Sequence, residues 1–361
     1  MTSYPAEPLG NDSGILELCQ AVAQDPQKAW DMTSKGRTVA LISDGSDIPG
    51  LGPIGPAACL PYLESQASFL RKVTCLKVLP LALNTRSAEE LVSVTNILSP
   101  SCGALCLDSL GDEIFLTAER LLAPLELPVF FNPQQSRPIL ALAALSRALA
   151  KTGRDIAACR IVLSGFESDS VQFVDFLLAA GAVDLVVCDR LGAIHKGRPG
   201  PTSWLKEHLA QKTNPKQIKG SLARTLAGAD VFISRASPLG LSKDMVASMA
   251  DRPVILNFSP GLLNPGVLAT GNNPVTLGVG PGPPTRLPAS LNTALVLAGL
   301  FTGTLKTGAG SITMAMRLAV SQKLSSLADD SEDRLLPLLS KPSMAQEVAE
   351  AVMEAAGHRA I

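Results

Sequence analysis

A glycine and an aspartate occur where a dinucleotide-binding fold places its first turn and its ribose-binding acid. Gly165 follows the apolar run 160–164, and Asp189 follows the apolar run 183–188, 24 residues after Gly165. In such folds the glycine permits a tight turn between the first strand and helix, and the acid accepts hydrogen bonds from a ribose. The spacing therefore makes Gly165 and Asp189 the candidate residues for binding NAD or NADP.

The rest of the glycine fingerprint is missing. The pattern G-x-G-x-x-G continues with Glu167 and Ser170 at its second and third glycine positions, and Asp169 lies in the first turn of the expected helix. A carboxylate at a helix N-terminus stabilises the helix, and it competes for the positive end that would hold a diphosphate. We therefore expect the ordinary NAD affinity of such a fold to be reduced.

Candidate acids for other chemistry occur in the first half of the chain. They are Asp44, Asp47, Glu64 and Asp108, with Cys106 as a candidate nucleophile. No nucleophile–base pair can be assigned among them. The histidines lie elsewhere: His195 and His208 occur in a charged stretch that is typical of a solvated surface, and His358 is close to the C-terminus.

Seven cysteines are scattered along the chain, mostly in apolar surroundings. This distribution is typical of reduced, buried thiols in a cytosolic protein. Cys102 and Cys106 are spaced C-x3-C, but no second pair follows them, so we predict no zinc site.

Apolar runs alternate with segments of helical periodicity, which is typical of parallel α/β layers. In the first half we expect strands at 38–42, 76–83, 104–107 and 129–131. A helix at 139–151 links the halves, and the second half repeats the alternation, with strands at 160–164, 183–188, 230–234 and 254–257. The second half has the doubly wound pattern of a nucleotide-binding domain.

Three regions are expected from this alternation. Residues 1–140 form an N-terminal α/β domain, residues 141–330 form a doubly wound Rossmann-like domain, and residues 331–361 form a C-terminal helical tail. The fold class is therefore α/β.

The segment 42–56 is specific enough to suggest a family. It reads I-S-D-G-S-D-I-P-G-L-G-P-I-G-P, and it resembles the I-S-D-G-T-x-x-x-G-L-G-x-I-G-P stretch of prokaryotic malic enzymes. The segments 178–190, 228–233 and 299–305 resemble later landmarks of that family, in order and with nearly its spacing. The resemblance implies a malic-enzyme N-terminal α/β domain followed by a Rossmann domain. It also implies metal-assisted oxidative decarboxylation of malate to pyruvate with NAD or NADP.

Most functional positions that the resemblance implies hold other residues here. Asn11 replaces the catalytic tyrosine and Gln66 replaces the general-base lysine; neither can supply the proton transfer of the original residue. The metal-binding Glu-Asp pair is Asp108-Ser109, and Pro133 stands at the third ligating position. Because one carboxylate does not satisfy an octahedral Mg²⁺ or Mn²⁺, we predict no metal site and assign no catalytic residue.

Two asparagines match substrate-contacting positions of the family. Asn257 stands at an N-P position in which Phe258 replaces the proline, and Asn292 matches the first residue of an N-N pair whose second is Thr293. Asn257 and Asn292 are therefore the candidate substrate-binding residues.

Two functions remain open from the sequence. The first is a non-catalytic family member that acts as a binding, regulatory or partner subunit, because the tyrosine, the lysine, the metal ligands and two glycines are lost together. The alternative is an active NAD(P)-dependent oxidoreductase of the family, with altered chemistry on malate or a related small acid. The resemblance implies a homodimer, or pairing with a malic enzyme paralogue, and a small-molecule ligand.

The overall composition excludes several classes of partner. The net charge is −1 without a basic block, which argues against nucleic acid, and a charge near zero favours self-association. Residues 1–10 lack the pattern of a signal peptide, and the longest apolar stretch, near 293–301, is shorter than the ~20 residues that span a bilayer. We therefore expect no membrane association and a cytoplasmic protein.

Overall fold

The computed structural model describes residues 13–85, 87–165, 169–200, 203–235, 240–257, 265–278, 289–328, 335–337 and 342–357. The chain divides into two compact units, which are considered separately. The first unit comprises Met1–Phe131, Phe301–Ile312 and Ala356–Ile361, and the second comprises Asn132–Leu300 and Thr313–Ala355.

The division differs from the expected boundaries at residues 140 and 330. The chain passes to the second unit at residue 132, and one helix, α12 (Ala289–Lys306), contributes residues to both units. The C-terminal segment is not a separate tail, because α14 (Pro342–Ala355) belongs to the second unit and buries Val348 and Val352. The unit to which a helix belongs cannot be predicted from the sequence pattern, because hydrophobic periodicity does not say which sheet a helix covers.

The first unit is built on a four-stranded sheet with the strand order β2-β1-β3-β4. β1 pairs in parallel with both β2 and β3. The strands are β1 (Thr38–Ser43), β2 (Lys77–Ala82), β3 (Ala104–Asp108) and β4 (Val129–Asn132).

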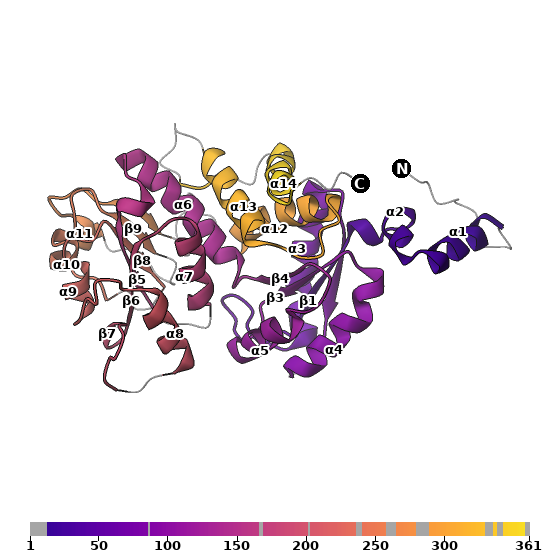
Figure 1. Cartoon of the computed structure of the whole chain (residues 1–361), viewed down its shortest axis with the longest axis horizontal. Coiled ribbons are helices and arrows are strands. Elements are labelled where there is room, and N and C mark those ends of the chain that lie inside the picture. The colour runs from indigo at the N-terminus through magenta and orange to yellow at the C-terminus, as the bar shows by residue number, and fades with distance from the viewer. Residues whose placement is uncertain are drawn as a thin grey trace. The chain divides into compact units, whose positions relative to one another are not determined.

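Helices cover the sheet of the first unit on both faces. α4 (Ala88–Leu98) and α5 (Asp112–Leu122) pack side by side, and their apolar faces form one core cluster with Ile42, Leu105 and Leu107 (Figure 1). Side chains alternate along a strand, so Cys106 and Asp108 of β3 point to the other face. That face is covered by α3 (Pro56–Val73), which contacts β1 and β2.

The second unit is built on a six-stranded sheet with the strand order β10-β9-β8-β5-β6-β7. The paired strands are parallel, except that β7 runs antiparallel to β6. From β5 the chain continues to β6 on one side and later to β8 on the other, so the topological switch point lies between β5 and β8. The strands are β5 (Arg160–Ser164), β6 (Asp184–Asp189), β7 (Gly192–Ala193), β8 (Val231–Ser234), β9 (Val254–Asn257) and β10 (Val275–Gly278).

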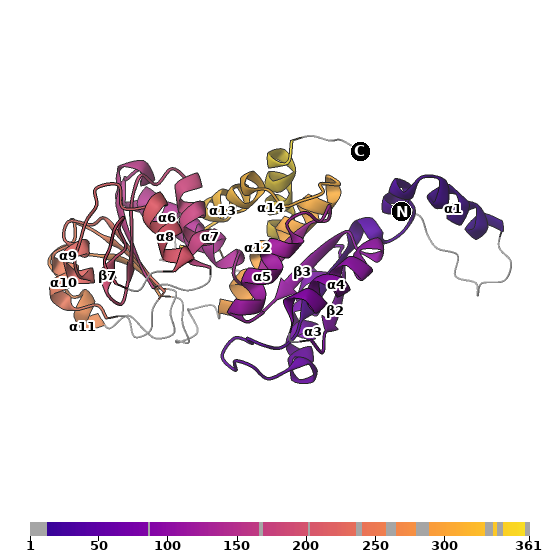
Figure 2. The ribbon, with the colours of Figure 1, turned by 60° about the horizontal axis from the view of Figure 1, so that its bottom comes forward.

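Helices on both faces complete this doubly wound arrangement, which confirms the expected α/β class. α9 (Leu222–Leu226) and α10 (Lys243–Ala247) pack on one face in a core with Val162, Phe232 and Ile255. α6 (Ser136–Thr152) and α7 (Ser170–Ala179) lie on the other side of the sheet (Figure 1). Figures 1 and 2 both show α13 (Met314–Ser326) between α6 and α14, and it contacts both.

The remaining described helices are short or lie outside the two sheet cores. They are α1 (Ser13–Gln24), α2 (Ala29–Met32), α8 (Trp204–Lys212) and α11 (Pro265–Leu268), with 3-10 turns at Pro26–Lys28, Lys35–Arg37, Ser99–Ser101 and Ile156–Ala158. In the described part of the chain, no helix combines the length and the apolar character that crossing a membrane requires.

Candidate functional site

The candidate dinucleotide residues meet at the carboxyl edge of the second unit's sheet. Ser164 of β5 is in register with Cys188 of β6, and the Gly165 amide donates a hydrogen bond to the Cys188 carbonyl at 3.1 Å. Gly165 has φ +111°, a conformation that favours glycine. Asp189 directly follows Cys188, so the structure brings Gly165 and Asp189 together.

One of the two candidate asparagines lies at the same edge. Asn257 ends β9, is 2% exposed and is in register with Ser234 at the end of β8. Ser234 is in turn in register with Ser164 of β5. Asn292 belongs to α12, but its side chain lies outside the described residues, and so do Asn11 and Glu167.

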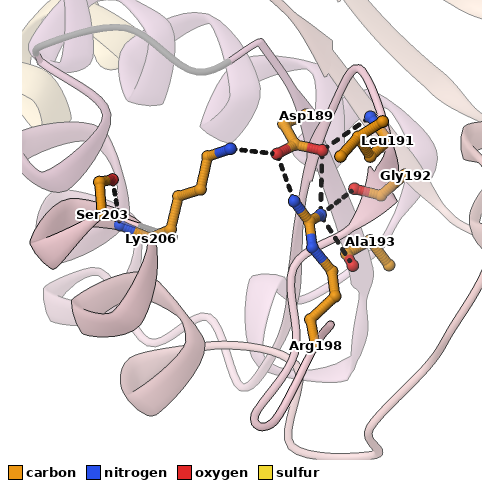
Figure 3. Close-up of polar contacts among 7 residues, drawn as sticks. All are labelled: Asp189, Leu191, Gly192, Ala193, Arg198, Ser203 and Lys206. Carbon is orange, nitrogen blue, oxygen red and sulfur yellow. Dashed lines mark hydrogen bonds and ion pairs between the residues drawn. The ribbon is translucent and has the colours of Figure 1, made fainter. Parts of the chain in front are cut away.

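The Asp189 carboxylate is enclosed by donors from its own chain (Figure 3). Oδ1 accepts from the Leu191 amide at 2.8 Å and from Arg198 Nη1 at 2.9 Å. Oδ2 accepts from Arg198 Nη2 at 2.5 Å and lies 3.0 Å from Lys206 Nζ. Burial by itself would raise the pKa of Asp189, but hydrogen bonds from Arg198, Lys206 and the Leu191 amide lower it to about 2.

These contacts use the hydrogen-bonding capacity of Asp189. A carboxylate offers about four acceptor positions, and Leu191, Arg198 and Lys206 supply four donors. A ribose hydroxyl could therefore bond to Asp189 only by displacing one of them. The cluster itself carries one negative and two positive charges, which leaves a net charge of +1 at this end of the edge.

The expected solvated surface around the histidines is wrong for His195, Arg198 and Lys206, but Lys196 and Glu207 are exposed as expected. His195 is 8% exposed, and its Nδ1 lies 2.9 Å from the Lys196 carbonyl oxygen. The side chains of Arg198 and Lys206 are 14% and 23% exposed. Arg198 and Lys206 are turned inward because Asp189, at the strand end, attracts them.

A second ion pair lies at the switch point between β5 and β8. Arg235 directly follows β8, and its guanidinium pairs with the carboxylate of Asp169, the N-cap residue of α7. Both residues are buried, at 5% and 2% exposure. Arg235 Nη1 also donates to Ser170 Oγ at 3.3 Å, and the guanidinium lies 4.5 Å from the centre of the Phe173 ring. An arginine of the chain thus faces the helix N-terminus at which dinucleotide folds hold a diphosphate.

In the first unit, the loops after β1 and β3 are joined by polar contacts. Asp44, which is 5% exposed, accepts from the Ser46 amide at 3.0 Å and from Ser46 Oγ at 2.6 Å. Ser46 Oγ accepts from the Gly111 amide at 2.7 Å, and the Asp47 amide donates to the Ser109 carbonyl at 3.1 Å. These bonds hold the two strand ends at one edge.

The fully buried Asp108 is bonded by the hydroxyl group of Ser109, which lies next to Tyr62. Ser109 Oγ donates to Asp108 Oδ1 at 2.6 Å and lies 3.5 Å from the Tyr62 hydroxyl. Burial, and then the charge of Asp108, raise the pKa of Tyr62 far above its ordinary value. The phenol therefore stays protonated and acts as a hydrogen-bond donor. Burial raises the pKa of Cys106 well above its usual range, so the thiol does not supply a thiolate nucleophile.

Gln66, at the position of the family's lysine, is also buried. It is 7% exposed, and in the described part of the chain neither its amide nitrogen nor its amide oxygen has a hydrogen-bond partner. It lies one helical turn after Tyr62, on the same side of α3. An amide does not titrate, so Gln66 cannot act as a general base.

The residues of the first unit do not fit a divalent cation. Mg²⁺ and Mn²⁺ require several oxygen ligands in near-octahedral geometry. Asp108 instead accepts a hydrogen bond from Ser109 Oγ, and no three His, Cys, Asp or Glu side chains form a metal-binding group among the residues that the structure describes.

Several site residues were not among the sequence candidates: Tyr62, Arg198, Lys206 and Arg235. Two of them carry a usable signal. Arg235 directly follows an apolar run, as Asp189 does, and Tyr62 precedes Gln66 by four residues on an expected helix. Arg198 and Lys206 could not be found in this way, because the sequence around a basic residue does not indicate which acidic residue it pairs with.

Comparisons with known proteins give a consistent result. No protein-family model matches the chain. The chain is 32% identical over 356 residues to an NAD-dependent malic enzyme of Geobacillus stearothermophilus, covering 95% of this chain and 72% of that protein. It is 32% identical over 355 residues to a bifunctional malic/malolactic enzyme of Bacillus subtilis strain 168, covering 96% and 85%.

Solved structures agree with these relatives. The NAD-dependent malic enzyme of Thermotoga maritima is 26% identical, with a TM-score of 0.82 over 98% of this chain and 95% of that chain. The malic enzyme of Pyrococcus horikoshii is 25% identical, with a TM-score of 0.84 over 99% and 86%.

Proposed function

The chain belongs to the malic enzyme family, and from this premise we propose that it is a ligand-binding member that does not decarboxylate malate oxidatively. The observation that carries the proposal is the buried Asp169–Arg235 pair at the N-terminus of α7. A diphosphate at this helix end would meet the Asp169 carboxylate, or would have to separate it from Arg235.

The energy of that separation is large compared with ordinary cofactor affinity. Removing one partner of a buried ion pair costs about 3–5 kcal/mol. Every 1.4 kcal/mol is about tenfold in affinity, so about 3 kcal/mol weakens binding on the order of 100-fold. A dinucleotide with micromolar affinity for an open site would then bind this one at roughly 0.1 mM or weaker.

The first unit supports the same proposal. Gln66 has no titratable proton, and the raised pKa of Tyr62 keeps its phenol protonated. Asp108 accepts a hydrogen bond from Ser109 Oγ where the family resemblance implies a metal ligand. Proton abstraction and metal binding are therefore both unsupported by the described residues of this unit.

An active NAD(P)-dependent oxidoreductase on malate or a related small acid is the second candidate. The names of the two relatives that are 32% identical favour it, whereas the residues at the site favour the first proposal. One feature of the site also supports it: Arg198 and Lys206 leave a net positive charge at Asp189, which suits a ribose 2′-phosphate. Under this second candidate the charge at Asp189 favours NADP, whereas one of the two relatives is named NAD-dependent.

An assay of the whole chain distinguishes the two candidates. The purified protein is mixed with Mn²⁺, malate and either NAD or NADP, and formation of the reduced cofactor is followed by its absorbance. We expect no rate above that of a blank without protein. A rate that Asp108→Ala abolishes, and that the exposed-site control Asp31→Ala leaves intact, would refute the proposal and support the oxidoreductase.

The proposal includes a cytoplasmic location and association with a second chain. A cytoplasmic location is supported by five buried free thiols, Cys59, Cys102, Cys106, Cys159 and Cys188, which suit a reducing compartment. A homodimer, or pairing with a malic enzyme paralogue, is supported by the net charge of −1 and by the family resemblance.

A further inference from the structure

The ion pair at the switch point leaves one carboxylate oxygen unused. Asp169 is 2% exposed, and its Oδ1 pairs with Arg235, but its Oδ2 is buried without a hydrogen-bond partner among the residues that the structure describes. Asp169 caps α7, yet its side chain accepts no hydrogen bond from the first turn of the helix. An unsatisfied buried acceptor is destabilising, and more so when it is charged. A donor from outside the chain would remove that cost.

The position of this oxygen is one at which open α/β sheets bind ligands. Ser164 at the end of β5 is in register with Ser234 at the end of β8, and the Arg235 amide donates to the Ser164 carbonyl at 2.8 Å. The two strand ends are thus directly adjacent, and Asp169 and Arg235 lie just beyond them. The crevice at such a switch point is the general ligand site of doubly wound folds.

The charges there select the kind of ligand. Arg235 already neutralises Asp169, so a cation would find no net negative charge, and a phosphate would face the free carboxylate oxygen. A neutral hydroxyl group can donate to Oδ2 without disturbing the pair. A buried acceptor discriminates strongly between ligand groups that donate a hydrogen bond and groups that only accept one, because an accepting group leaves the buried acceptor unpaired.

We propose that the switch point of the second unit binds the neighbouring hydroxyl groups of a neutral ligand, such as a ribose, through Asp169, and discriminates against phosphorylated forms. This inference rests on the proposed function, since it requires that no dinucleotide diphosphate occupies the N-terminus of α7. The hydroxyl groups could belong to a nucleoside or to a free sugar, and the two sources are separated by the ligands tested.

The test compares ligands by thermal shift and calorimetry on the full-length protein without metal. The ligands are adenosine, ribose, AMP, ADP-ribose and NAD. We expect adenosine or ribose to raise the melting temperature, and AMP to bind at least tenfold more weakly than adenosine. A shift with adenosine alone identifies a nucleoside, and an equal shift with ribose identifies the sugar.

Substitutions test whether Asp169 causes the preference for adenosine over AMP. Asp169→Asn removes the charge that opposes a phosphate, so the ratio of the AMP and adenosine dissociation constants should fall toward one. Asp175→Asn is the matched control on the same helix, where Asp175 pairs with Lys212 at 2.6 Å, and it should leave the ratio unchanged. If Asp169→Asn does not fold, the double variant Asp169→Asn/Arg235→Gln removes both charges and should give the same fall.

Three results would overturn the inference: no binding of adenosine or ribose at millimolar concentration, AMP or NAD binding as tightly as adenosine, or an unchanged ratio in Asp169→Asn. These outcomes are separate from failure of the proposed function, which is measured by malate-dependent cofactor reduction. Absence of both turnover and adenosine binding would remove this inference and leave the loss of malate chemistry standing.

Discussion

At the scale of single residues, the second unit concentrates its electrostatics on two aspartates. Asp189 accepts hydrogen bonds from Arg198, Lys206 and a backbone amide, and Asp169 pairs with Arg235. Both carboxylates lie at the carboxyl edge of one sheet, where a nucleotide would otherwise supply or accept charge. The chain has therefore provided internal partners for the charged groups of this edge.

The lowered pKa of Asp189 predicts a pH dependence of stability. Because its folded-state pKa of about 2 lies below the ordinary value of about 3.9, its contribution is present above pH 4 and is lost as the pH falls toward 2. Asp189→Asn should lower the free energy of unfolding at pH 7 by about 1–2 kcal/mol, as measured by urea denaturation. The difference from wild type should shrink between pH 4 and pH 2.

A control accompanies that measurement. Asp175→Asn breaks a half-exposed pair with Lys212, and it should change the stability by less than about 1 kcal/mol. A loss in Asp189→Asn that persists unchanged at pH 2 would show that the effect is not electrostatic.

The buried amide of Gln66 predicts a stabilising substitution. Gln66→Leu removes two polar atoms that lack partners and keeps a similar volume, so it should raise the free energy of unfolding by about 1 kcal/mol. Gln24→Leu, at an exposed position of α1, is the control and should have little effect. A clear loss of stability in Gln66→Leu would mean that the amide is satisfied in solution, by water or by a ligand.

At the scale of elements, the loop between β1 and α3 is closed by the contact of two glycines. The carbonyl of Gly45 accepts hydrogen bonds from the amides of Ile54 and Gly55, both at 3.0 Å. Gly45 has φ +70°, and a Cβ placed on it would lie 2.2 Å from the Gly55 carbonyl oxygen. The loop is therefore one in which only a glycine permits the backbone approach.

Two alanine substitutions in this loop should differ. Gly45→Ala meets both an unfavourable φ and the Gly55 backbone, whereas Gly50→Ala has an unfavourable φ of +79° but nothing within 4 Å. We expect Gly50→Ala to cost about 1 kcal/mol and Gly45→Ala clearly more, as compared by urea denaturation midpoints. Equal midpoints would indicate that the loop opens to accommodate Gly45→Ala.

The contact between α12 and α14 predicts a coupled pair of substitutions. A Cβ on Gly299 would lie 2.3 Å from Val348 Cγ1, and Val348 is fully buried. Gly299→Ala should therefore cost about 1–3 kcal/mol, and Val348→Ala in the same chain should recover part of that loss. A double-mutant cycle by urea denaturation measures the coupling, with Gly310→Ala, which has nothing within 4 Å, as the control. Additive costs would exclude the contact.

At the scale of the whole molecule, the chain carries the malic-enzyme arrangement of two sheet-based units with little net charge. Its net charge is −1 and its isoelectric point is about 6.3, so long-range repulsion between copies is weak near neutral pH. We expect light scattering after size-exclusion chromatography to give twice the 37.6 kDa mass of the chain. A mass of one chain at micromolar concentration would refute the homodimer and leave pairing with a paralogue to be tested by co-purification.

Local pattern determined much of this protein. Apolar runs such as 160–164 and 254–257 form strands, because a buried parallel strand requires continuous apolar residues. Their alternation with helices predicted the doubly wound second unit, and the segment 42–56 led to the family. The replacement of the family's lysine by Gln66 and of a metal ligand by Pro133 was also evident from the sequence, since it depends only on which residue occupies a position.

The tertiary structure alone decided how the remaining charges are satisfied. Asp169 meets Arg235 across 66 positions of sequence, and Asp189 meets Arg198 and Lys206, because the order of strands brings their ends to one edge. The division between units likewise departs from the boundaries at residues 140 and 330, since the chain passes to the second unit at residue 132 and α12 contributes residues to both units. Strand order and helix return are long-range properties, and local periodicity carries no information about them.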